Sequence, residues 1–208
     1  MRSGFAHMRI RISKQELNDL AVAWFAVSLA FSIILLRSQN ALLSPYLLVG
    51  LFLNFVVAGI AVGFGFVFHE LAHKITAEYY GCAAEFRAAR KMLWFGVLFS
   101  FFGFVFIAPG AVVISGHLGR NRNGKISLAG PLANIVIALM FLAIVKLIVI
   151  PSQMLSLIAS YGFRINSWLA LFNMIPFFVL DGKKIFDWNK WVWGFFALIS
   201  VILVFFIS

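Results

Sequence analysis

The sequence predicts an all-α membrane protein, a polytopic bundle of about five transmembrane helices with one re-entrant or interfacial hairpin. Two observations lead to this class. Of the 208 residues, 63% are hydrophobic and 12% are charged, whereas a soluble domain is about half apolar and roughly a quarter charged. The chain also contains uncharged runs near the roughly 20 residues that a bilayer-spanning helix needs. A soluble enzyme, a secreted scaffold and a disordered tail are therefore excluded.

The uncharged runs place the expected elements in order along the chain. They cover residues 20–36, 41–68, 92–115, 126–145, 165–180 and 191–208. From them we expect helices at 20–36, from about 46 into the seventies, and at 126–150, 165–180 and 191–207. The run 92–115 is ambiguous because Gly103 and Pro109-Gly110 interrupt it. We interpret it as the hairpin; a sixth spanning helix is the alternative, since the run is long enough to cross a bilayer.

Basic residues cluster between the apolar runs and give a formal net charge of +10. Residues 1–19 form a basic leader, which precedes a single transmembrane domain at 20–208. Basic segments beside membrane helices stay in the cytosol and contact anionic headgroups. The charge therefore predicts a cytosolic N-terminus and contact with the lipid bilayer, and it argues against a nucleic-acid partner. One cysteine, Cys82, excludes an internal disulfide framework.

The second expected helix ends in His69-Glu70-Leu71-Ala72-His73, the pattern H-E-x-x-H. On a helix, positions i and i+4 share one face, so both imidazoles can hold one Zn²⁺ while the adjacent carboxylate reaches its bound water. Zinc lowers the pKa of that water toward neutrality, and Glu70 can accept its proton. Ionisable groups at the end of an apolar helix are costly unless they serve a function. We interpret the pattern as a zinc site; a wet helix end with ordinary histidine hydrogen bonds is the alternative.

Two histidines do not complete a catalytic zinc site, which has a third protein ligand and an open position for water. The segment directly after His73 contains no further histidine. The acidic candidates are Glu78, Glu85, Asp181 and Asp187. Glu85 would act like the downstream glutamate of soluble proteases. Asp181 follows an apolar run and precedes a glycine, so it can face the interior of a helix bundle.

Three motifs in order resemble the site-2 protease family of intramembrane zinc metalloproteases. They are H-E-x-x-H, then G-P-x-x-N in the next helix, then N-x-x-P-x-x-x-L-D-G. The matching residues are His69, Glu70, His73, Gly130, Pro131, Asn134, Asn173, Pro176, Leu180, Asp181 and Gly182. They span a core of about residues 46–185. The chain departs from the family at Phe178-Val179, where many members carry a second proline, and it resembles a short form without PDZ or CBS domains.

The resemblance implies a zinc-dependent endopeptidase that hydrolyses a peptide bond within or near a transmembrane segment of another membrane protein. It implies His69, His73 and Asp181 as the ligands of one zinc ion. Glu70 would be the general base. Asn173 would contact the substrate or the developing oxyanion.

Asn134 belongs to the G-P-x-x-N motif, but its position varies within the family. Substrate binding is one role for Asn134, and a hydrogen bond between helices is the role that we prefer. Because the chain lacks the regulatory domains of many relatives, a separate membrane protein could restrain access of the substrate helix. The identity of the substrate is not encoded in any motif.

The order of the helices gives a test that needs no family knowledge. His73 and Asp181 can share a metal only if both lie at the same membrane face. If 92–115 re-enters, Asp181 returns to the side of His73, and 14 Lys and Arg residues lie inside against three outside. If it spans, Asp181 lies opposite His73 and the counts become 10 and seven. Zinc geometry and the positive-inside rule both favour re-entry, with the site toward the cytosol.

Two other functions fit the motif. A zinc protease that cuts at the membrane surface would use Glu85 as its third ligand and would lose its metal in Glu85→Ala. A non-catalytic metal-binding scaffold or pseudoprotease would bind metal without turnover. Against the scaffold, metal binding alone does not need the glutamate between the two histidines.

Overall fold

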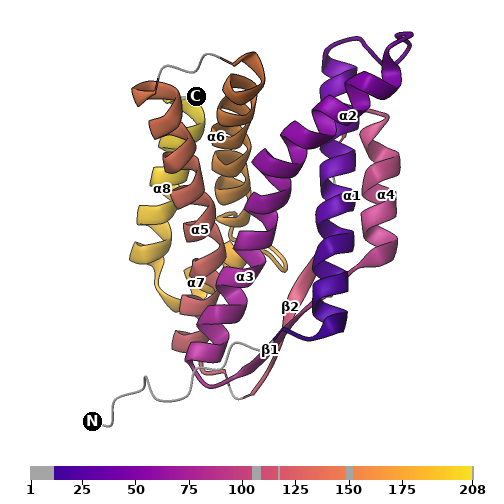
Figure 1. The fold of residues 1–208 in the computed structure, drawn as a ribbon. Helices are drawn as coiled ribbons and strands as arrows, with labels where there is room; N and C mark the ends of the chain where they lie inside the picture. Colours follow the sequence, from indigo (N-terminus) through magenta and orange to yellow (C-terminus); the bar gives the residue numbers. More distant parts are fainter. Residues whose placement is uncertain (1–11, 105–108, 117, 149–151, 208) are drawn as a thin grey trace.

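The computed structural model describes residues 12–104, 109–116, 118–148 and 152–207. The elements are α1 (Lys14–Ser38), α2 (Leu47–Ala58), the π-helix η1 (Gly59–Gly63), α3 (Phe64–Tyr79), β1 (Ala83–Ala88), α4 (Arg90–Ser100), β2 (Gly110–Ser115), α5 (Arg120–Leu147), α6 (Gln153–Asn173), α7 (Asp181–Trp188) and α8 (Lys190–Phe205). Figure 1 shows the long helices side by side, with β1, β2 and α7 at one end of the bundle. We call this the sheet end.

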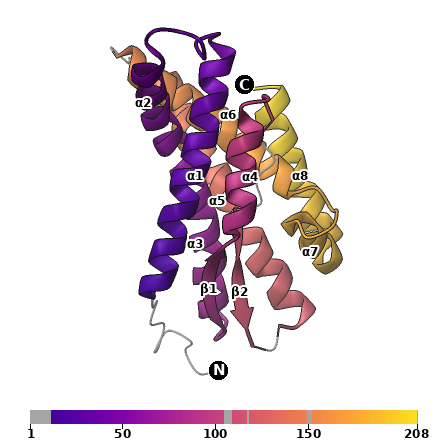
Figure 2. The ribbon, with the colours of Figure 1, turned by 90° about the vertical axis from the view of Figure 1, so that its right-hand side faces the viewer.

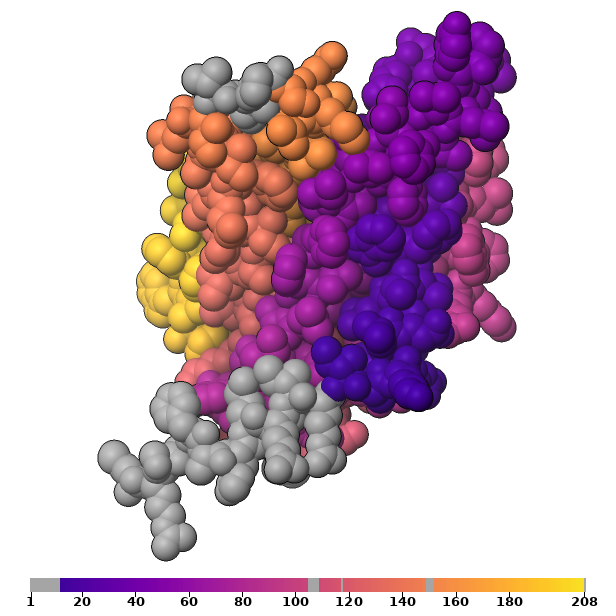
Figure 3. Space-filling view, viewed as in Figure 1, coloured from indigo at the N-terminus to yellow at the C-terminus, as the bar shows by residue number. Residues whose placement is uncertain are grey.

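The helices have the length and surface of a membrane protein. Within the described residues, three helices are long and apolar enough to cross a bilayer: α1, the continuous helix Leu47–Tyr79 and α5; α8 is apolar but shorter. Large apolar side chains remain exposed on them, among them Leu48, Phe52 and Phe195. Figure 3 shows Leu47–Tyr79 along one face of the molecule, between α1 and α5. Extended apolar surface of this kind is expected where a protein faces lipid.

Helix α1 begins at Lys14, six residues before the predicted start, because Ser13 caps it. The Ser13 hydroxyl accepts the backbone N–H of Glu16 at 3.0 Å. Ser-x-x-Glu is the sequence signature of a capped helix start. Residues 14–19 of the expected leader are therefore the first turns of α1, and residues 1–11 lie outside the described residues.

The second predicted helix is present as one continuous helix from Leu47 to Tyr79, interrupted by the π-helical turn at 59–63. In this turn the Phe64 N–H bonds five residues back, to the Gly59 carbonyl. The Trp24 indole also donates to that carbonyl, at 3.1 Å. π-helical turns occur frequently at functional sites, and this one ends six residues before His69.

The run 92–115 enters and leaves at the same end of the bundle. Helix α4 rises beside α1, and β2 then pairs antiparallel with β1, from Ala83↔Ser115 to Ala88↔Gly110 (Figure 2). The 11 residues of α4 make a helix about 16 Å long, too short for a hydrocarbon core of about 30 Å. The all-α expectation is corrected here, because β1 and β2 form a small sheet; residues 105–108 lie outside the described part.

Several boundaries differ in the C-terminal half. Helix α5 begins at Arg120 rather than 126, because polar residues continue the helix beyond its apolar part. Helix α6 covers Gln153–Asn173 rather than 165–180. Pro176 lacks an N–H and disfavours continuation, and Phe178 adopts a φ of 52°. A new helix, α7, then starts at Asp181.

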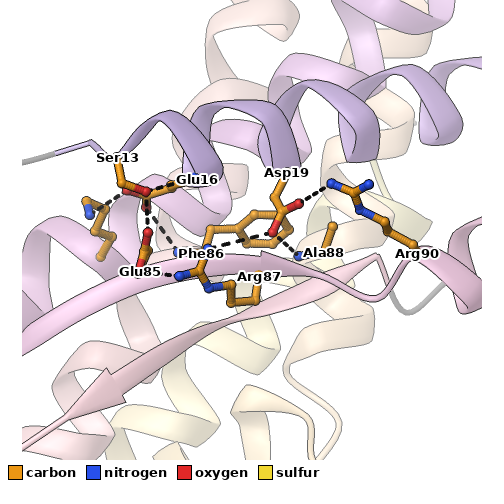
Figure 4. Close-up of polar contacts among 9 residues, drawn as sticks. Ser13, Glu16, Asp19, Glu85, Phe86, Arg87, Ala88 and Arg90 are labelled. Atoms are coloured by element: carbon orange, nitrogen blue, oxygen red, sulfur yellow. Dashed lines mark hydrogen bonds and ion pairs between the residues drawn. The ribbon is translucent and has the colours of Figure 1, made fainter.

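Buried charges fix the N-terminal end of α1 to β1 (Figure 4). Glu16 is fully buried, pairs with Lys74 at 2.9 Å and accepts the Phe86 N–H at 3.0 Å. Asp19 accepts the Ala88 N–H at 3.4 Å and pairs with an arginine of α4. Phe86 and Ala88 alternate along β1, so both N–H groups point to the edge that β2 leaves open. The two carboxylates of α1 therefore cover that edge, and Lys74 ties α3 to α1.

Candidate metal centre

Two histidines of α3 and the first residue of α7 converge near the sheet end. The Nε2 atoms of His69 and His73 lie 3.0 Å apart. Asp181 Oδ2 lies 3.0 Å from Nε2 of His73 and 3.3 Å from Nε2 of His69. All three side chains are buried and could hold a metal ion. The structure thus brings together the three residues that the motifs predicted as ligands, although 108 positions separate His73 from Asp181.

The donor set fits a zinc ion. His69 Nδ1 lies 2.5 Å from Asn134 Oδ1, and His73 Nδ1 lies 2.8 Å from the carbonyl of Ile126. An acceptor at Nδ1 holds the ring proton there, so Nε2 of the neutral ring carries a lone pair. Two nitrogen lone pairs and a carboxylate oxygen then face one another with no proton between them, so they repel. A cation bound among the three atoms turns this repulsion into attraction. Tetrahedral ligands at the usual zinc distances lie about 3.4 Å apart, close to the spacing found here.

Gly130 on α5 packs directly against the two imidazoles. A Cβ added at this position would lie 2.4 Å from Nε2 of His73 and 2.5 Å from Nε2 of His69. Even an alanine would therefore press on the two atoms that face the metal position. The glycine of the G-P-x-x-N motif is needed because α5 approaches α3 so closely at this point.

Two buried asparagines connect His69 to the neighbouring helices. The Asn134 amide nitrogen donates to Asn166 Oδ1 at 3.0 Å and to the Gly65 carbonyl at 3.3 Å. The Asn166 amide nitrogen donates to the Ala61 carbonyl of the π-helical turn at 2.8 Å. Asn134 thus forms hydrogen bonds between helices, as preferred from the sequence, and its contact with substrate stays a prediction. Asn166 was not predicted; the available signal was a lone amide within an apolar helix, which is costly unless bonded.

The other predicted residues occupy different places. Glu70 is 9% exposed and follows His69 on α3. Asn173, at the end of α6, donates to the Leu169 carbonyl of its own helix at 2.9 Å; its contact with substrate or oxyanion stays a prediction. Glu85 lies on β1, where it contacts Ser13 and Arg87. The geometry therefore brings Asp181, and not Glu85, to the histidines.

Asp181 is held as a carboxylate. Burial alone would raise its pKa, but without a metal the positive charge and hydrogen bonds of protonated His73 and His69 stabilise the carboxylate, so the pKa lies below its ordinary value. Lys184, one turn further along α7, lies 3.7 Å from the other oxygen, Oδ1. The ionised form is the one that coordinates a metal.

Fold and site together define a helical membrane protein with a buried His-His-Asp cluster suited to one metal ion. The chain is 40% identical over 190 residues to a protein of Methanocaldococcus jannaschii named "Putative zinc metalloprotease MJ0611", and the match covers 90% of this chain and 92% of that protein. No family model and no solved structure matches the chain. The chain belongs to this family of zinc metalloproteases, and its cofactor is zinc.

Proposed function

We propose that the protein is an intramembrane zinc endopeptidase of the site-2 type. It would hydrolyse a peptide bond within or near a transmembrane helix of another membrane protein. The observation that supports this most directly is the convergence of His69, His73 and Asp181 at the end of long apolar helices. The Glu70 carboxylate, which metal binding alone does not require, directs the proposal toward hydrolysis.

The side chains divide the chemistry between them. His69, His73 and Asp181 hold the zinc ion, which supplies Lewis-acid polarisation and a lowered water pKa when bound. Glu70 accepts a proton from the attacking water and returns it to the departing amine. The Asn173 amide donates to the substrate oxygen as charge develops there. The substrate helix must unwind locally, because its carbonyls are otherwise hydrogen-bonded within the helix.

The proposed topology has five crossings: α1, Leu47–Tyr79, α5, α6 and α8. The segment 92–115 re-enters, which its return to β1 supports. The N-terminus and the sheet end face the cytosol, because basic residues of α4, α5 and α7 gather there. Residues 20–208 then form one domain whose catalytic core is about 46–185. A separate membrane protein would regulate access of the substrate.

Three variants test the function with two readouts, bound zinc and cleavage of a reporter transmembrane helix. Glu70→Gln should keep zinc and lose cleavage, whereas Asp181→Ala should lose both. Glu85→Ala is the control and should keep both. Cleavage by Glu70→Gln would exclude the assigned base, and metal loss in Glu85→Ala but not in Asp181→Ala would favour the surface protease. A zinc-loaded wild type that cleaves no reporter would favour the scaffold.

A further inference from the structure

A surface cavity of about 440 Å³, open to the outside, lies between the first turn of α5 and α7. Arg120 and Asn123 line it from α5, and Lys184 and Asp187 line it from α7. On each helix the two residues are three positions apart and so share a face. Beside the cavity the helices pack closely, because a Cβ at Gly124 would lie 2.3 Å from Cβ of Trp188.

The lining of the cavity favours an anion. Asp187 already forms an ion pair with Lys183, so its charge is balanced within α7. No acidic side chain of the described residues pairs with Arg120. Lys184 forms an ion pair with Asp181 Oδ1 at 3.7 Å, and its side chain is 44% exposed, so an anion in the cavity can still reach its ammonium group. The N-terminal end of α5 adds the positive end of its dipole, and no side chain caps it.

The neighbouring residues place this cavity at the level of lipid headgroups. Trp188 ends α7, and Trp191, which is 89% exposed, lies in the first turn of α8 beside Lys190. Tryptophans concentrate at the boundary between lipid and water, and lysines there reach the headgroups. On α5 the change from basic to apolar sequence occurs at Ile126, one turn beyond the cavity. At this depth, the phosphate of a lipid headgroup is a better candidate for the ligand than free phosphate from the solvent.

We propose that the cavity binds the phosphate of an anionic phospholipid. Arg120 and Lys184 contact the phosphate oxygens from two sides, and the Asn123 amide donates to the same group or to the glycerol oxygens. Basic pockets between helices at a membrane surface are suited to such headgroups. The proposed site touches the metal cluster only through the ion pair of Lys184 with Asp181, and its test measures lipid binding and does not depend on proteolysis.

The test measures binding of a fluorescent short-chain phosphatidylglycerol to the full chain in detergent micelles. We expect saturable binding that phosphatidylglycerol competes and phosphatidylcholine does not. Arg120→Gln and Lys184→Gln should each weaken binding about fivefold. Arg120→Lys, which keeps the positive charge, should retain most of the wild-type affinity. Lys125→Gln removes the same charge from the same end of α5 outside the cavity lining, so it should change binding less than twofold.

Four outcomes would overturn the proposal. Equal weakening in Lys125→Gln would indicate general attraction to the basic surface. Displacement of the probe by millimolar inorganic phosphate as effective as by phosphatidylglycerol would indicate a site for free phosphate. Displacement by an acidic peptide, but not by unlabelled phosphatidylglycerol, would indicate a substrate subsite. Unchanged binding in a folded Arg120→Gln and Lys184→Gln double variant, with wild-type melting temperature, would exclude the cavity.

Discussion

Nδ1 of His69 lies 2.5 Å from Oδ1 of Asn134, and the nitrogen of the same amide bonds Asn166 on a third helix. The orientation of one imidazole in the metal cluster thus depends on two asparagines that are fully buried. Such partners fix the tautomer of a metal-binding histidine and the direction in which its free nitrogen points. The Asn166 amide in turn bonds the π-helical turn of the same helix that carries His69.

The first prediction concerns Asn134. Asn134→Ala should weaken zinc binding by about 10- to 100-fold, because the ring of His69 loses the acceptor that orients it. Competition with a chromogenic chelator measures the affinity. Asn54→Ala is the matched control: Asn54 is also buried but pairs with Gln39 at the opposite end of the bundle. Unchanged zinc affinity in Asn134→Ala would show that the ring is held by packing alone.

The second prediction concerns Gly130. Gly130→Ala should remove most of the bound zinc, because its Cβ would meet both Nε2 atoms within 2.5 Å. The control is Gly194→Ala on α8, where an added Cβ meets nothing within 4 Å. Alanine favours a helix over glycine by about 1 kcal/mol, so a loss at position 130 cannot arise from helix propensity. Full zinc content in Gly130→Ala would contradict the close packing of α5 against the histidines.

The third prediction concerns the buried pair of Lys74 and Glu16. Lys74→Met should lower the free energy of unfolding by about 3–5 kcal/mol, because two carboxylates lose their cation while Glu16 stays fully buried. Lys183→Met breaks an exposed pair with Asp187 and should cost less than about 1 kcal/mol. Unfolding in mixed micelles with increasing denaturing detergent measures both. Equal effects would show that the buried pair stabilises the fold no more than an exposed pair does.

The fourth prediction concerns the membrane topology. Cys82 is the native cysteine and is buried, so Cys82→Ala provides a background for labelling. Single cysteines at Lys91 and Asn121, which flank the segment 92–115, should react with an impermeant maleimide from the same face of sealed vesicles. Reaction from opposite faces would mean that the segment crosses, and the proposed five-helix topology would be wrong.

The metal cluster could be predicted from the sequence because each of its members belongs to a motif whose spacing has a physical explanation. The i and i+4 spacing put two imidazoles on one helix face, and an aspartate after an apolar run indicated a place inside the bundle. The structure brings His73 and Asp181 to 3.0 Å, as a common membrane face for both requires. Asn166 carries no such pattern, since only its distant partners reveal its role.

The errors in the predicted helix boundaries have a common physical cause. Apolar runs in a sequence report which residues contact lipid, and they do not report where the backbone hydrogen bonds of a helix begin and end. Helix α6 continues through the exposed Arg164, whereas the predicted helix began only after that charge, at residue 165. Helix α5 extends into basic sequence at Arg120 for the same reason. The β1–β2 pairing joins segments more than 20 residues apart, and local alternation of side chains does not encode such a partner.

The π-helical turn at Gly59–Gly63 makes the helix tolerant of one change in length ahead of the metal cluster. That turn holds one residue more than regular α-helix would accommodate. Deleting a single residue from it would let the helix revert to regular winding, and both histidines would keep nearly the same direction around the helix axis. The same deletion from the regular helix at Phe64–Phe68 would instead rotate the preceding part of the helix by about 100° relative to the histidines. A relative that is one residue shorter can therefore keep the zinc-binding face only if the missing residue falls in the π-helical turn.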